Sequence, residues 1–169
     1  LSARDSETSN VNPFSTIAYE LAKDLNGGVT RQNLLAAEDI VAKSMNSGLT
    51  TLMSSGPLQT PVDGSNVSEI VKASEVLAEI VRRTRDALNS GGRGVTADDV
   101  IESLGADLID GVIEGNGGAR ADARTAAVAN VATAEVILEA MSNQLHVNGV
   151  DATDAMRSAI EQVVPAASG

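Results

Sequence analysis

The chain has 169 residues and a formal net charge of −11, and 43% of its residues are hydrophobic although it has one Phe, one Tyr and no Trp. This length suits one domain with a core, which must be aliphatic. The acidic charge argues against nucleic acid and anionic membranes as partners. The absence of cysteine excludes disulfides, thiol catalysis and zinc–thiolate sites.

The ends of the chain differ in composition from its middle. We expect a polar N-terminal segment over residues 1–11, a helical domain over residues 12–164 and a linker-like tail over residues 165–169. The chain starts with Leu1 and contains neither a signal peptide nor an apolar run of membrane-spanning length. We therefore expect a mature product or a segment of a longer protein.

Apolar residues recur at helical spacing from the beginning of the domain. Asn12 and Pro13 predict a helix start, and the first helix is expected over about residues 13–25 with Tyr19 half exposed. Its inward stripe is Phe14, Ile17, Ala18, Leu21, Ala22 and Leu25. A second helix should run to about residue 46, with Leu34, Ala37, Val41 and Met45 facing inward.

A loop rich in Pro and Gly, residues 54–66, separates these helices from a long third one that should end near residue 89. Its predicted inward residues are Ile70, Ala73, Leu77, Ile80, Val81, Thr84 and Leu88. Its predicted solvated basic cluster is Arg82, Arg83 and Arg85. The fourth helix should place Val100, Ile101, Leu104, Leu108 and Val112 inward.

The fifth helix is expected over about residues 121–145 and is rich in alanine. Its predicted inward face is Ala123, Ala127, Val131, Ala134, Leu138, Met141 and Leu145. After a turn at residues 146–149, a short last helix should cover about residues 152–163.

One phrase occurs three times, and each copy is typical of a helix start. The copies are residues 28–33 (GVTRQN), 94–99 (GVTADD) and 149–154 (GVDATD). Thr30, Thr96 and Asp151 should be the N-caps, and the Asn or Asp three residues later can answer the cap as in a capping box. No segment shows sustained strand alternation. We therefore predict an all-α, single-domain bundle of five to seven helices.

Common catalytic arrangements are poorly supported. His146 is the only histidine and lies in a predicted turn, so a Ser–His–Asp triad is not indicated and a di-metal centre with two Glu-x-x-His motifs is excluded. The glycine-rich segments 91–94 and 115–118 lack the phosphate-loop pattern and suggest flexible connections between helices. We predict no catalytic residues and no organic cofactor.

The best candidate for a ligand site is an acidic segment in the second half of the chain. Asp107, Asp110 and Glu114 are three and four residues apart, so they would share one face if the fourth helix continued through them. Together with Asn116 they offer oxygen ligands suited to calcium, although the EF-hand spacing is absent. A calcium site and a solvated acidic face are the two alternatives.

Two stretches resemble a helical module found in large bacterial surface proteins and lipoproteins. Residues 12–18 (NPFSTIA) resemble its Thr-Pro-Leu-Thr-Thr-Leu-Ala opening, with Phe14 in place of Leu. Residues 101–115 resemble its Ala-Asp-Leu-x-Asp-Gly-x-x-Asp-Gly segment, with Glu114 in place of Asp. The resemblance implies an extracellular or cell-surface location, with the periplasm as an alternative, and implies no catalytic activity.

The expected function is therefore a non-enzymatic structural or interaction module of an exported bacterial multidomain protein. Its partners would be neighbouring domains of the same chain or another protein. A calcium-stabilised ligand-binding domain is the alternative, and a carboxylate-based enzyme is the less favoured third hypothesis, because only the acidity of the chain supports it.

Overall fold

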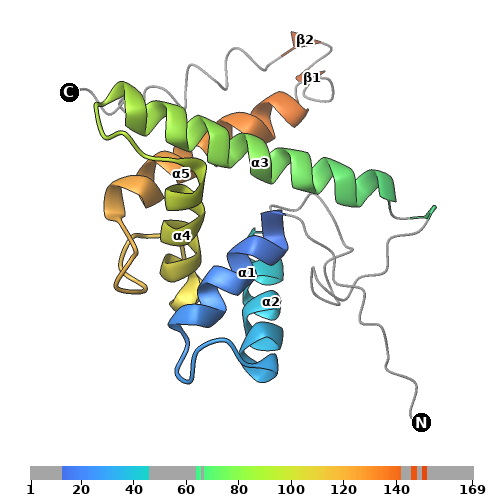
Figure 1. The fold of residues 1–169 in the computed structure, drawn as a ribbon. Helices are drawn as coiled ribbons and strands as arrows, with labels where there is room; N and C mark the ends of the chain where they lie inside the picture. The colour runs from blue at the N-terminus through green and yellow to red at the C-terminus, as the bar shows by residue number, and fades with distance from the viewer. Residues whose placement is uncertain (1–12, 46–63, 66, 142–145, 148–149, 152–169) are drawn as a thin grey trace.

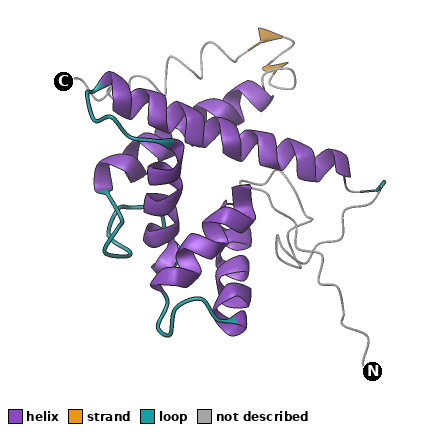
Figure 2. Cartoon of the chain, viewed as in Figure 1, coloured by secondary structure: helices purple, strands orange, loops and turns teal. Residues whose placement is uncertain are grey.

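The computed structural model describes residues 13–45, 64–65, 67–141, 146–147 and 150–151. The predicted all-α fold is confirmed in these residues (Figures 1 and 2). The elements are α1 (Pro13–Asp24), α2 (Arg31–Met45), α3 (Val67–Ser90), α4 (Ala97–Asp107), the 3₁₀ turn η2 (Leu108–Asp110), α5 (Ala123–Met141), β1 (His146–Val147) and β2 (Val150–Asp151). None of the helices in this part of the chain is long and apolar enough to cross a membrane.

The N-cap of α2 is the predicted Thr30, whose Oγ1 accepts a hydrogen bond from the Asn33 amide at 3.1 Å. The Asn33 side chain does not answer the cap in the way a capping box would. Its Nδ2 donates instead to the carbonyl oxygens of Gly28 at 2.6 Å and Asn26 at 3.0 Å. Asn33 therefore joins the start of α2 to the loop that follows α1.

The second copy of the repeated phrase forms a complete capping box. The Thr96 Oγ1 accepts from the Asp99 amide at 3.1 Å, and the Asp99 Oδ2 accepts from the Thr96 amide at 2.7 Å. Two of the donors that a helix start leaves without an intrahelical partner are thereby satisfied. In the third copy, Val150 and Asp151 form β2, which pairs antiparallel with β1. The sequence did not predict this short pairing.

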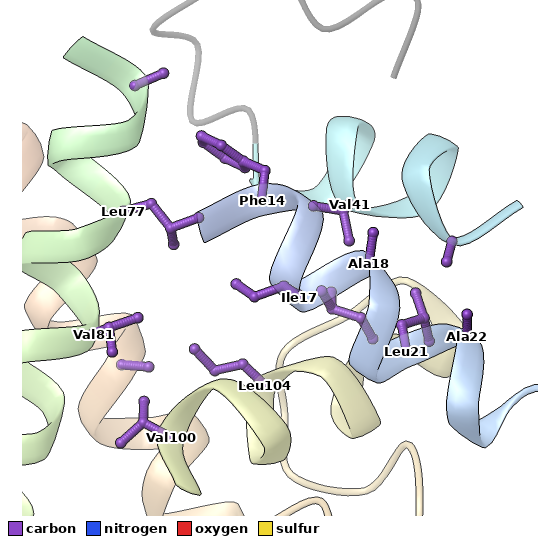
Figure 3. Close-up of a cluster of buried hydrophobic side chains, with 14 of the residues drawn as sticks. Phe14, Ile17, Ala18, Leu21, Ala22, Val41, Leu77, Val81, Val100 and Leu104 are labelled. Carbon is purple, nitrogen blue, oxygen red and sulfur yellow. The ribbon is translucent and has the colours of Figure 1, made fainter. Parts of the chain in front are cut away.

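The core forms where α1 contacts α2, α3 and α4 (Figure 3). The predicted stripe of α1 is confirmed from Phe14 to Ala22, whereas Leu25 follows the end of the helix and is only partly buried. Tyr19 is 47% exposed, as predicted. The partners of α1 are Ala37 and Val41 from α2, Leu77 and Val81 from α3, and Val100 and Leu104 from α4. Each fully buried Leu or Ile contributes roughly 1.5–3 kcal/mol, so these aliphatic contacts dominate the stability of the fold.

Helix α4 lies at the centre of the bundle, where it contacts α1, α3 and α5. It approaches α1 closely at Gly105. A Cβ atom at this glycine would lie 2.7 Å from the Glu20 Cβ and 3.2 Å from the Ile17 carbonyl oxygen. A glycine within a helix costs up to about 1 kcal/mol in helix propensity. Its small size here permits the contact between the two backbones.

Helices α3 and α5 run antiparallel, because Arg93, just after α3, meets Asp122 before α5, whereas Arg83 meets Glu139. Ile80 packs with Ala132 and Val136 between them. The predicted inward face of α5 is confirmed at Leu138 and wrong at Ala123 and Ala127, which are exposed, whereas Val131 and Ala134 are partly buried. The buried face is Thr125, Ala126, Ala129, Ala132, Val136 and Leu138. Alanines lie on most sides of α5, so the sequence gives little indication of which side is buried.

Several predictions lie outside the described residues. They are the polar segment 1–11, the continuation of the second helix to residue 46, most of the loop 54–66, the last helix at 152–163 and the tail 165–169. The side chains of Met141 and His146 also fall outside what the structure describes, as does Leu145.

Candidate functional site

The acidic segment that the sequence singled out does not continue as a helix. Helix α4 ends at Asp107, η2 follows, and Gly111 takes a left-handed conformation with φ of 84°. The helical premise for placing Asp107, Asp110 and Glu114 on one face is therefore wrong. Val112, predicted to face inward, is 52% exposed.

Asp107 is the centre of this region, and its side chain is only 1% exposed. Both of its carboxylate oxygens accept hydrogen bonds from the Gly115 amide, at 2.8 and 2.7 Å. Its Oδ1 also accepts from the Gly117 amide at 3.1 Å. Backbone N–H groups thus surround the carboxylate and offset the cost of burying a charge.

The other predicted calcium ligands point elsewhere. Asp110, Glu114 and Asn116 are exposed, and the Asp110 Oδ1 accepts from the Val112 amide at 3.0 Å. In the described part of the chain, no three acidic or histidine side chains form a group suited to a metal ion. A calcium site in this segment stays the alternative to a solvated acidic face.

The glycines of residues 115–118 let this loop pack directly on the end of α4, which differs from the flexible connection that the sequence suggested. A Cβ atom at Gly117 would lie 2.0 Å from the Asp107 carbonyl oxygen, and one at Gly118 would lie 2.8 Å from that of Ala106. At Gly115 it would lie 2.1 Å from the Ala123 Cα. The backbone occupies the space that side chains would need. We call residues 111–118 the glycine loop.

Arg120 joins the segment after the glycine loop to two helices. Its guanidinium donates to the Glu20 Oε2 at 2.8 Å and to the Asp24 Oδ2 at 2.9 Å, both on α1. It also lies 3.3 Å from the Glu102 Oε2 on α4. Burial opposes ionisation of Glu20, but hydrogen bonds from Lys23 and Arg120 outweigh it and hold the pKa of Glu20 below its ordinary value. No local pattern in the sequence points to Arg120, because its partners on α1 are about a hundred positions away.

A second connection starts from Arg93 in the loop between α3 and α4. Its guanidinium donates to the two carboxylate oxygens of Asp122, at 2.7 and 3.2 Å. Asp122 is also the N-cap of α5, since its Oδ1 accepts from the Thr125 amide at 2.7 Å. The Arg93 hydrogen bond, helped by Thr125 and opposed by burial, lowers the pKa of Asp122 to about 2.

The basic cluster of α3 is paired rather than simply solvated. Arg82 and Arg83 both donate to Glu79, and Arg83 also reaches Glu139 and Glu135 on α5. The hydrogen bonds from Arg82 and Arg83 lower the pKa of Glu79 to about 2. Arg85 pairs with the adjacent Asp86. The sequence prediction of a solvated cluster is therefore wrong for Arg83, whose side chain is 23% exposed.

These charged groups share one electrostatic property. The pKa is lowered at four of the described acids, Glu20, Glu79, Asp99 and Asp122. It is raised at five of the described bases, Lys23, Arg82, Arg83, Arg93 and Arg120. Each group is therefore held in its charged form. A general acid or base that works near neutral pH needs the opposite shift in a carboxyl or a lysine.

Comparison with known protein families, with curated proteins and with solved structures gives no significant match to this chain.

Proposed function

We propose that this chain is a non-enzymatic structural module that holds or spaces neighbouring domains of an exported bacterial protein. The observation that carries the proposal is that its arginines form ion pairs between distant parts of the chain. Arg83, Arg93 and Arg120 each connect segments that are distant in sequence. The carboxylates that they contact are paired in these connections. Such groups fix how helices sit against one another.

The free energies of ion pairing and of core burial agree with a positioning role for these arginines. A partly exposed ion pair adds about 0.2–1 kcal/mol, much less than the burial of one core leucine. The core therefore supplies most of the stability, whereas the arginine contacts define helix register and loop position. The bacterial surface context is supported by the resemblance of residues 12–18 and 101–115 alone.

The proposal is tested by placing the 169-residue chain between a donor and an acceptor fluorescent protein. Energy transfer is measured during urea titration beside the helical circular dichroism signal. A structural spacer keeps the distance between the two reporters constant until one cooperative transition, at which both signals change together. A distance that drifts while the helices remain intact would overturn the spacer role.

A matched control uses the same fusion with Arg120→Gln. Because Arg120 connects the glycine-loop end to α1 and α4, we expect both transitions to move to lower urea together. Separation of the two transitions in the unsubstituted fusion would show independently unfolding parts, which a spacer cannot have.

A further inference from the structure

The chain contains three Asn-Gly dipeptides, at residues 26–27, 116–117 and 148–149, of which the structure describes the first two. In this sequence the glycine nitrogen can lose its proton and attack the Asn side-chain carbonyl carbon. Ammonia leaves, a five-membered succinimide forms, and water opens the ring to aspartate or isoaspartate. Glycine favours the reaction because no side chain hinders the approach and its backbone dihedrals are unrestricted.

At the second dipeptide the attacking nitrogen is engaged. The Gly117 amide donates to the Asp107 Oδ1 at 3.1 Å, and the Gly117 backbone packs directly on the Asp107 carbonyl. To attack Asn116, this nitrogen must leave the hydrogen bond and move away from α4. It must also lose a proton beside a buried carboxylate, where a second negative charge is repelled.

Within the residues that the structure describes, the attacking nitrogen of the first dipeptide has no comparable contact with a buried carboxylate. Asn26 and Gly27 are both exposed, in the loop between α1 and α2. The hydrogen bonds among the described residues include none donated by the Gly27 amide. The nearest atom that a Cβ at Gly27 would meet is the Asn33 Nδ2, at 3.8 Å. The Asn26 carbonyl oxygen accepts a hydrogen bond from the Asn33 Nδ2 at 3.0 Å, but this bond is exposed and involves no charged group.

We propose that the fold makes the two sites differ in deamidation rate. Asn26 is a site of spontaneous deamidation, whereas the contact between Asp107 and Gly117 protects Asn116. Deamidation at Asn26 adds a negative charge just beyond the C-terminal end of α1, near Asp24. Negative charge at that end of a helix is unfavourable. The conversion of Asn26 therefore weakens the end of α1, and the glycine loop is spared the same change.

The experiment incubates the full chain at mildly alkaline pH and quantifies deamidation at each dipeptide by peptide mapping with mass spectrometry. Folded protein is compared with the same protein in concentrated urea. We expect the rate at Asn26 to differ by no more than a few-fold between the two states. Asn116 should react at least about tenfold more slowly when folded, because tenfold corresponds to about 1.4 kcal/mol, which a hydrogen bond to a charged group can supply. Equal rates for Asn116 in the two states would overturn the proposal, as would a faster folded rate, which would make Asp107 a base.

Two variants identify the protecting group. Asp107→Asn should raise the rate at Asn116 in the folded protein, whereas Asp110→Asn, which changes a neighbouring carboxylate bonded to Val112, should not. Circular dichroism verifies that each variant is folded. If Asp107→Asn unfolds, hydrogen exchange at the Gly117 amide of the unsubstituted protein replaces it, and fast exchange at this amide would contradict the proposal.

Discussion

Arg93 and Asp122 form a two-bond ion pair that joins the loop before α4 to the first turn of α5. Asp122 thereby combines two roles, since the same carboxylate caps α5 through the Thr125 amide. The relationship places the N-terminus of α5 beside the C-terminal end of α3, from which the antiparallel packing of these two helices follows.

Replacement of Asp122 by Ala should destabilise the protein by about 1–2 kcal/mol, because an N-cap is lost together with the partner of Arg93. The free energy of unfolding from urea titration measures the effect. Asp39→Ala is the matched control: it breaks the ion pair with Lys43, in which both side chains are more than 60% exposed, and no measurable change is expected. Equal losses in the two variants would contradict the dual role of Asp122.

Acid should weaken the fold in a defined window. Glu79 and Asp122 have pKa values of about 2 in the folded chain, against ordinary values of 4.5 and 3.8. A lowered folded pKa gives stability that is present above the unfolded pKa and is lost as the pH falls through the folded pKa. The melting temperature should therefore fall between about pH 4.5 and pH 2. Glu79→Gln should reduce this dependence, and a curve parallel to that of the unsubstituted protein would exclude the contribution of Glu79.

The substitution Gly105→Ala should destabilise the protein, although the same change in an ordinary exposed helix stabilises it by up to about 1 kcal/mol. The new methyl group would lie 2.7 Å from the Glu20 Cβ and 3.1 Å from the Leu21 backbone nitrogen, which forces α1 and α4 apart. Overpacking of this kind costs about 1–3 kcal/mol. Thermal unfolding of Gly105→Ala beside Lys72→Ala, an exposed substitution on α3, tests the close approach. Increased stability of Gly105→Ala would show that the helices have room.

Calcium should leave the melting temperature unchanged. A cation stabilises a protein only by binding the folded state preferentially, and the oxygens of Asp107 already face the amides of Gly115 and Gly117. The comparison is a thermal melt in EDTA and in millimolar calcium. A rise of several degrees with calcium that disappears in Asp110→Asn would instead establish the calcium-stabilised alternative.

The buried face of a helix could be predicted from the sequence where apolar and polar residues lie on clearly different sides. In α1, Ile17 and Leu21 lie on one side and Tyr19 on the other, so the buried face could be assigned. In α5, small apolar residues occur on most sides, and the choice between Ala127 and Ala129 depends on how α3 packs rather than on local pattern.

The geometry predicted for the acidic segment was wrong. The spacing of Asp107 and Asp110 suggested one face of a helix. Instead, the chain turns at Gly111, which is left-handed, and the glycine loop folds back so that the Gly115 amide contacts Asp107. The contacts of Arg120 with Glu20 and Asp24 could not be predicted, because no local pattern records a pairing between such distant positions.

The central position of α4 has a consequence for the order in which the chain acquires its structure. The hairpin of α1 and α2 is local in sequence, yet the inner side of α1 is covered only by the later helices α3 and α4. Glu20 meets Arg120 only after a further segment. During synthesis, the apolar surface of α1 and α2 therefore stays exposed until much of the chain has been translated. Exposed apolar surface favours aggregation. Dependence on such distant contacts also slows folding relative to helical proteins of simpler up-and-down connectivity.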